Sequence, residues 1–170
     1  MPDLFVVRHA EPEMHGLMLG RTDPPLSAAG RLEAQARMAP LRGEIVYSSP
    51  LRRARETASF VPAPLVVIDG LAEIAYGEWE GLTWAQIEEK WPELARRKQR
   101  DWFAVTPPGG ESREEVSVRA ARALEQIRCG PFPAIVVAHF GFNAEFLRQA
   151  AGIDPLTFSQ GYCEVVPVLL

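Results

Sequence analysis

FVVRHAEPE, at residues 5–13, runs three apolar residues directly into an arginine and a histidine. The apolar residues are typical of a sheet strand, because β-branched and aromatic side chains pack well on a pleated surface. Arg8 and His9 are strongly polar and rarely buried without a partner. We therefore expect a buried strand that ends here and directs both basic side chains into a site.

Other apolar runs along the chain resemble this strand. They are rich in valine and isoleucine and do not alternate with polar residues, a pattern typical of strands buried on both faces of a sheet. The expected strands are Leu4–Val7, Ile45–Tyr47, Leu65–Ile68 and Ile135–Ala138, with Val165–Leu170 as a further candidate.

Helical segments separate these strands, and several carry a start or stop signal. A serine or threonine three residues before a glutamate or glutamine predicts a capped helix start. A proline predicts a break or a restart, and a glycine predicts an end. We expect helices from Ser27 to about Met38, over Leu51–Phe60, from Thr83 with an interruption at Pro92, from Ser112 to about Cys129, and over Phe142–Ala151.

Strands that alternate with helices predict an α/β fold. We expect a three-layer sandwich with a mainly parallel central sheet covered by helices on both faces. The chain has 170 residues, a length that suits one domain, and no internal repeat or low-complexity linker divides it. We therefore expect a single domain over residues 1–170.

Composition excludes several classes of protein. Hydrophobic residues make up 47% of the chain and charged residues 24%, and the formal net charge of -4 argues against general nucleic-acid binding. We find no signal peptide and no run of about 18 apolar residues that would span a membrane, so we expect a cytoplasmic protein. Cys129 and Cys163 allow one disulfide, but no zinc-ligand spacing occurs, so we expect no metal. The oligomeric state stays open.

Polar residues of unusual type follow the expected strands. Arg8 and His9 come after the first, Ser49 after the second, Glu73 shortly after the third and His139 after the fourth. In open, mainly parallel sheets, ligands bind beyond the carboxyl ends of the strands. We therefore expect these side chains to meet in one site.

Such residue types suit phosphoryl transfer without a metal. A neutral imidazole can attack phosphorus without first losing a proton, and neighbouring arginines favour that neutral form by charge repulsion. Arginines also hold a phosphoryl dianion with paired hydrogen bonds. A carboxylic acid can then give a proton to the leaving oxygen. His9 with Arg8, Arg53 and Glu73 could supply these roles.

Five short motifs, in order along the chain, resemble those of the histidine phosphatase superfamily, the phosphoglycerate-mutase-like group. The matching stretches are Arg8-His9-Ala10, Ser49–Ala58, Leu71–Gly81, Gly110-Glu111-Ser112 and His139-Phe140-Gly141. GRTDPPLSAAG, at residues 20–30, also matches a family pattern. Two residues depart from the motifs. Ala10 stands where glycine is usual. Phe140 stands where a small residue is usual and could make the pocket narrower or more apolar.

The resemblance implies a role for each candidate. His9 would be the phosphorylated nucleophile, and Glu73 would be the general acid and later the base for water. Arg8, Arg53 and His139 would clamp the phosphoryl group. Arg21 is a further candidate for contact with the substrate. No metal or cofactor is implied, and the expected partner is a small-molecule phosphomonoester.

Other interpretations remain open for neighbouring residues. Arg52 and Arg55 are expected at the surface, and Glu78 and Glu80 compete with Glu73 for the acidic role. His15 is expected in a loop. The four tryptophans are expected to pack in the fold rather than to bind a ligand; they are Trp79, Trp84, Trp91 and Trp102.

The resemblance favours a metal-independent phosphomonoesterase, similar to short bacterial phosphatases such as α-ribazole phosphatase. One alternative is a phosphoglycerate mutase, which needs to keep water from its phosphoenzyme. With 170 residues the chain has little room for an enclosing lid. The other alternative is a non-catalytic phosphoryl-binding regulatory protein, which loss of a core residue would favour; the sequence retains all five.

Overall fold

A computed structural model describes residues 3–170 of the chain. In this part of the chain the strands form one five-stranded sheet with the order β3-β2-β4-β1-β5. The strands are β1 (Leu4–Arg8), β2 (Ile45–Ser48), β3 (Leu65–Val67), β4 (Ala134–Ala138) and β5 (Val165–Val168). All neighbouring strands are parallel except β5, which pairs antiparallel with β1. The predicted mainly parallel sheet is confirmed.

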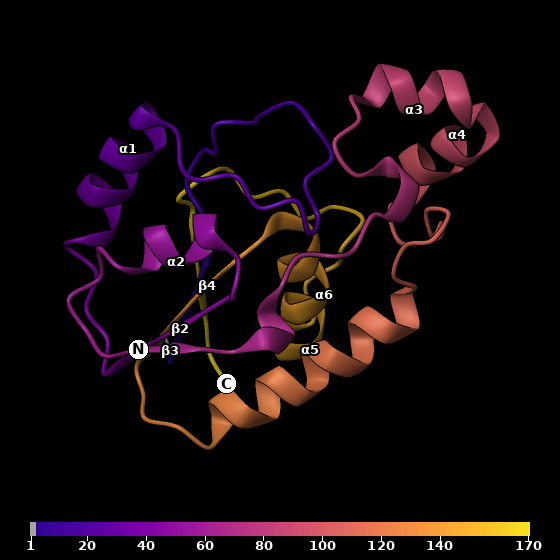
Figure 1. Ribbon diagram of the computed structural model, residues 1–170. Helices are drawn as coiled ribbons and strands as arrows, with labels where there is room; N and C mark the ends of the chain where they lie inside the picture. Colours follow the sequence, from indigo (N-terminus) through magenta and orange to yellow (C-terminus); the bar gives the residue numbers. More distant parts are fainter. Residues whose placement is uncertain (1–2) are drawn as a thin grey trace.

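Helices cover both faces of the sheet and produce the predicted three layers (Figure 1). On one face, α1 (Ala28–Met38) and α2 (Arg52–Ala58) pack over a core that includes Val7 and Val46. On the other face, α5 (Arg113–Arg128) and α6 (Phe140–Ala151) pack over a second core. A helical pair, α3 (Trp84–Lys90) and α4 (Pro92–Arg100), stands beyond the sheet at the upper right of Figure 1.

Three of the predicted helix starts are confirmed by hydrogen bonds. The Ser27 hydroxyl accepts from the amide of Gly30 at the start of α1. Reciprocal capping boxes begin α3 at Thr83 and α5 at Ser112. Pro92 does not end the helical segment but restarts it as the first residue of α4, where its missing amide costs no hydrogen bond. Cys129 and Cys163 are free.

Two expectations about these elements were wrong. The third strand was expected to be buried on both faces, but Leu65, Val66 and Val67 are all exposed. The reason is its position: β3 lies at the edge of the sheet and pairs with β2 alone. The last helix begins at Phe140 rather than Phe142, because a carboxylate from a distant segment, described below, caps its first amides.

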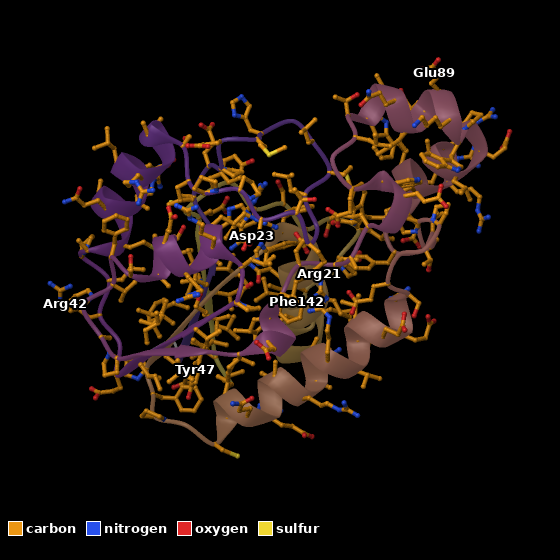
Figure 2. The ribbon with its side chains drawn as sticks, viewed as in Figure 1. Arg21, Asp23, Arg42, Tyr47, Glu89 and Phe142 are labelled. Carbon is orange, nitrogen blue, oxygen red and sulfur yellow. The ribbon has the colours of Figure 1, made fainter. Side chains whose placement is uncertain are left out.

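Most polar side chains lie at the surface of the layers, and most of the side chains buried between them are apolar. Figure 2 shows Arg42 and Glu89 reaching away from the fold, whereas Phe142 lies inside it. The inward-facing residues of β4 are completely buried. Burying one valine or leucine side chain contributes about 1.5–3 kcal/mol, so the central strands contribute strongly to stability. The sheet is therefore a stable scaffold that fixes the positions of the side chains at the ends of its strands.

Gly77 provides a test of how tightly one supporting turn is packed. Its φ is +55°, and a methyl group there would overlap the backbone of Pro108 and Gly109. Gly81 has a similar φ of +73° but open space around it. We expect Gly81→Ala to lower the free energy of unfolding by about 1–2 kcal/mol from backbone strain alone. Gly77→Ala should cost about 3 kcal/mol or more, because overpacking is added.

Urea unfolding of both variants measures this difference. Equal losses in the two variants would contradict the packing shown for the turn that begins at Gly77.

Candidate active site

A cavity of about 170 Å³ opens where β1 ends. Four of the residues predicted from the sequence line it, namely Arg8, His9, Arg53 and Glu73. His139 lies directly beside it, because its ring centroid is 5.0 Å from that of His9. The structure therefore brings together five residues from four separate segments of the chain.

His9 is held in one tautomer by its neighbours. Its Nδ1 lies 2.7 Å from the carbonyl oxygen of Ala10, which can only accept a hydrogen bond, so Nδ1 carries the proton. Nε2 then keeps its lone pair and accepts from Nε of Arg53 at 3.3 Å. The backbone is held as well, because the Ala10 amide donates to the Thr57 hydroxyl at 3.0 Å. His9 thus presents an unprotonated Nε2 to the cavity.

The electrostatic surroundings favour this neutral imidazole. Burial lowers the pKa of His9 well below its usual value, and the guanidinium groups of Arg53 and Arg8 act in the same direction. The side chain is only 6% exposed. A neutral His9 remains available as a nucleophile in mildly acidic solution.

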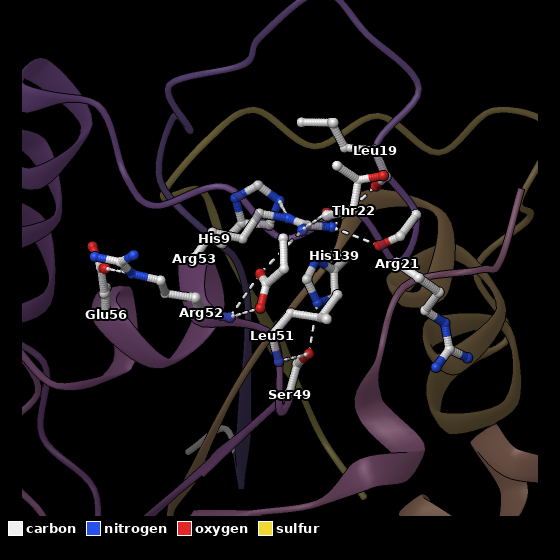
Figure 3. A network of polar contacts seen from close by, with 12 residues as sticks. His9, Leu19, Arg21, Thr22, Ser49, Leu51, Arg52, Arg53, Glu56 and His139 are labelled. Carbon is white, nitrogen blue, oxygen red and sulfur yellow. Dashed lines mark hydrogen bonds and ion pairs between the residues drawn. The ribbon is translucent and has the colours of Figure 1, made fainter. Parts of the chain in front are cut away.

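Arg53 links His9 to the loop that covers it. It is only 1% exposed, and its two terminal nitrogens donate to the carbonyl oxygens of Leu19, Gly20 and Thr22 at 2.8–3.0 Å. Figure 3 shows this guanidinium between His9 and the loop. A buried arginine without such partners would be strongly destabilising, so these carbonyls allow a positive charge to sit beside the nucleophile.

Arg8 is oriented by aromatic side chains. Its guanidinium carbon lies 4.1 Å from the ring centroid of Tyr162 and 5.5 Å from that of Phe140. One terminal nitrogen donates to the carbonyl oxygen of Gln160 at 2.8 Å. Cations are attracted to aromatic faces within about 6 Å. The aromatic pair and the carbonyl therefore hold Arg8 at the cavity wall.

His139 occupies a completely buried position between β4 and α6. Its Nε2 lies 2.7 Å from the hydroxyl of Ser49, and its Nδ1 has no hydrogen-bond partner among residues 3–170. Burial lowers the pKa of His139 well below its usual value, and His9, Arg53 and other cations lower it further. His139 is therefore a neutral imidazole with one polar atom free for a ligand.

Glu73 is only 5% exposed and caps the last helix. Its carboxylate accepts from the amides of Gly141 at 3.1 Å and Phe142 at 2.8 Å, at the start of α6. Amides at a helix start attract anions, including phosphate groups. The start of α6 therefore fixes the position of the Glu73 carboxyl group.

Arg119 of α5 holds the segment that carries Glu73. Its guanidinium donates to the carbonyl oxygens of Gly70 at 2.8 Å and Ala72 at 2.6 Å, and it pairs with Glu111 at 2.6 Å. Glu111 also accepts from the amide of Ala75. The Gly-Glu-Ser motif thus supports the backbone on both sides of Glu73.

The two carboxylates that compete with Glu73 for the acidic role, Glu78 and Glu80, do not line the cavity. Glu78 is exposed, whereas Glu80 reaches across to the covering loop and accepts from the amides of Gly20, Arg21 and Thr22 at 2.8–3.2 Å. Hydrogen bonds, led by the Arg21 amide, lower the pKa of Glu80 despite its partial burial. Glu80 therefore positions the loop that also binds Arg53.

Arg21 does not join the other predicted residues. Its side chain is 49% exposed and lies 3.7 Å from a carboxylate oxygen of Glu111, away from the lining of the cavity. Its contact with the substrate stays a prediction. Figure 2 places Arg21 near the front of the fold.

Several lining residues were missed by the sequence reasoning. Tyr162, Tyr76 and Trp102 line the cavity, and so does the loop at residues 16–19. His15 was not missed: it was expected in a loop, with substrate contact as the alternative, and it lies on the cavity lining. Trp102 was expected only to pack in the fold. The departure at Phe140 was the one sequence signal for this aromatic wall, because it replaces a small residue beside His139.

The described residues carry no cluster of three or more histidine, cysteine, aspartate or glutamate side chains suited to a metal ion. In the same part of the chain, none of the helices combines the length and apolar character needed to cross a membrane. The charge that would meet a phosphoryl group here comes from Arg8 and Arg53.

Comparisons with known proteins find matches over most of the chain. The family model for the histidine phosphatase superfamily (branch 1) matches residues 4–168. A bifunctional protein of Mycobacterium tuberculosis is 40% identical over 159 residues, which are 86% of this chain and 43% of that protein. The chain thus spans less than half the length of that relative. Phosphoserine phosphatase 1 of Hydrogenobacter thermophilus is 36% identical over 175 residues, covering 96% of this chain and 83% of the relative.

Solved structures share the fold. A mycobacterial glucosyl-3-phosphoglycerate phosphatase in complex with VO3 has a TM-score of 0.85 at 27% identity, covering 97% of this chain and 90% of that one. An Escherichia coli protein assigned provisionally as an alpha-ribazole-5'-P phosphatase has a TM-score of 0.79 at 22% identity, covering 99% and 96%. The second likeness concerns the fold alone.

The buried histidines predict a pH dependence of stability. His9 and His139 have native pKa values below that of an unfolded histidine, about 6.5, so below this pH the unfolded chain binds more protons. The free energy of unfolding should therefore fall as the pH drops from about 7.5 to about 5. His139→Asn should weaken this dependence, and His15→Asn, which changes an exposed side chain, should not. Urea unfolding at several pH values measures it; equal slopes in both variants would contradict the burial argument.

Glu80 provides a second test. Glu80→Gln replaces a carboxylate oxygen by an amide group that repels the loop amides, so the loop loses its anchor. We expect kcat/KM for an aryl phosphate to fall about tenfold or more, as for other positioning groups. Glu78→Gln, an exposed change on the same turn, is the matched control and should keep the original value. Loss of activity in both variants would point to a general charge effect instead.

Proposed function

The chain belongs to branch 1 of the histidine phosphatase superfamily, and we propose that it is a metal-independent phosphomonoesterase that works through a phosphohistidine on His9. The observation that carries the proposal is the fixed tautomer of His9. Its Nε2 keeps a lone pair, faces the cavity and lies between Arg53 and the ring of His139. This arrangement suits attack on phosphorus by a neutral nitrogen.

In the first step, the hydrogen bond from Nε of Arg53 opens and frees the lone pair of Nε2 on His9. Nε2 then forms a bond to phosphorus as the bond from phosphorus to the alcohol oxygen breaks. Glu73, as a carboxylic acid, gives its proton to that oxygen, and the alcohol leaves. Arg8, Arg53 and the free Nδ1 of His139 offer donors to the phosphoryl oxygens. Donors placed in advance around developing charge lower the barrier.

In the second step, water attacks the phosphorus of the phosphohistidine. The Glu73 carboxylate takes a proton from the water, and the bond between phosphorus and Nε2 breaks. Inorganic phosphate leaves, and His9 is again neutral with its proton on Nδ1. Burial and the nearby arginines favour that neutral state.

A phosphatase is favoured over a mutase by the relatives. The phosphoserine phosphatase of Hydrogenobacter thermophilus aligns with 96% of this chain, whereas a phosphoglycerate mutase of Bartonella quintana, 32% identical, aligns with 68%. Two similar proteins are named as phosphatases of phosphoserine and of glucosyl-3-phosphoglycerate. An α-ribazole-phosphatase-like activity stays a candidate on the resemblance of the sequence motifs. We propose a small phosphomonoester as the partner, a cytoplasmic location and no nucleic-acid binding.

A trapped intermediate tests the proposal. The protein is mixed with p-nitrophenyl phosphate, quenched in base because phosphohistidine is labile in acid, and measured by intact mass. We expect one added phosphoryl group on the original chain and more of it on Glu73→Gln, which cannot activate water. His9→Asn should carry none.

Arg52→Ala is the control, because this exposed neighbour of Arg53 pairs with Glu56 at the surface. It should retain the label. No label on any variant together with no release of p-nitrophenol would overturn the proposal and favour a non-catalytic binding protein.

A further inference from the structure

The substrate class can be inferred from the half of the cavity that does not face the phosphoryl group. We propose that the enzyme acts on phosphomonoesters of uncharged, largely apolar alcohols, with Trp102 and Phe140 as the side chains that determine this specificity. The inference rests on the proposed function and concerns the same site. It goes beyond the relatives, among which acidic substrates such as phosphoserine are named.

The cavity has little positive charge to spare. Among the described residues, Arg8 and Arg53 are the arginines that line it, and no lysine does. Arg53 already donates to three carbonyl oxygens and to His9, and Arg8 donates to Gln160. The N–H donors of these two arginines that remain available are needed to bind the phosphoryl oxygens. A second anion, such as a carboxylate close to the phosphate, would be buried without a counter-ion, which is strongly unfavourable.

The nearest other cations do not fill this gap. Arg21 is half exposed and faces Glu111 rather than the cavity. Lys98 is 3% exposed, donates to the carbonyl oxygen of Val105 at 2.9 Å, and lies 4.7 Å from the ring centroid of Trp102. Burial lowers its pKa to about 8. Glu73 lines the cavity as well, and a carboxyl group supplies no positive charge for a second anion.

Aromatic side chains form the walls where the alcohol must lie. Tyr76 and Trp102 meet edge to face with ring centroids 6.4 Å apart. Phe140 stacks on Phe158 at 5.7 Å with an interplanar angle of 14°. These contacts hold the walls in place, so the cavity offers a preformed apolar surface rather than mobile polar groups.

The aromatic wall continues into a second cavity. This neighbouring cavity has a volume of about 410 Å³ and shares Trp102 and Phe140 with the first. Its lining adds the aromatic side chains of Trp84, Phe103 and Phe158, and its polar members are Lys98, Gln99 and Arg100. The first cavity, at about 170 Å³, is small for a whole substrate. We infer that an extended alcohol lies against Trp102 and Phe140, the side chains that the two cavities share.

Matched substrates test the inference. Benzyl phosphate and 3-phosphoglycerate both release a primary alcohol, and they differ in that the first carries an apolar ring and the second a carboxylate and a hydroxyl group. We expect kcat/KM to be at least about tenfold higher for benzyl phosphate, and 2-naphthylmethyl phosphate to be at least as good. In Trp102→Ala, the ratio of kcat/KM for benzyl phosphate to that for methyl phosphate should fall several-fold.

A variant that is expected to gain activity gives a second test, because a misfolded protein would lose activity rather than gain it. His15→Arg places a cation at an exposed position on the cavity lining, and it should raise kcat/KM for 3-phosphoglycerate relative to benzyl phosphate by about tenfold. Met14→Arg is the control, because it adds the same charge next to His15 but outside the lining. It should leave that ratio as in the original chain.

The outcomes separate the two proposals. If benzyl phosphate and 3-phosphoglycerate are both inert and no phosphohistidine forms, the proposed function fails. If the label forms and 3-phosphoglycerate is turned over as well as or better than benzyl phosphate, the substrate inference alone is overturned. An unchanged ratio of benzyl to methyl phosphate in Trp102→Ala would overturn the role of the aromatic wall.

Discussion

Parallel pairing of β1 with β4 is the constraint on which the candidate site depends. The register sets Arg8 opposite Ala138, and the His9 amide extends the ladder to the carbonyl of Ala138 at 2.9 Å. The two histidines therefore leave neighbouring strands at the same level. A slip of one residue would turn every side chain of β1 to the other face of the sheet. Because both faces are covered by packed cores, the register is strongly specified.

Buried charge is the second element of the arrangement. Arg53 beside His9 would be costly alone, and the loop carbonyls that satisfy it belong to the segment that Glu80 holds from the other side. Arg119 does the same for the segment of Glu73. Each charged group is thus stabilised by a piece of backbone that it also positions. The same hydrogen bonds therefore position the site residues and offset the free-energy cost of burying their charges.

Much of the fold could be predicted because its signals are local. Apolar runs, capping boxes at Thr83 and Ser112, and the alternation of strands with helices each depend on a few adjacent residues. The exposure of β3 could not be predicted, because the sequence of a strand does not determine whether the strand lies at the edge or the centre of the sheet. The start of α6 at Phe140 was also missed, because its cap is Glu73, far away in the chain.

Local sequence was enough to place Arg8, His9 and His139 at strand ends, because a strand's side chains and its end are set by neighbouring residues. The ordered motifs added Arg53 and Glu73 as candidates, whose roles stay proposals. The aromatic wall of Tyr162, Trp102 and Phe140 depended on folding, because these residues come from three segments with no shared pattern. The residues proposed to bind phosphate could thus be predicted along the chain, whereas those proposed to contact the alcohol are brought together only by folding.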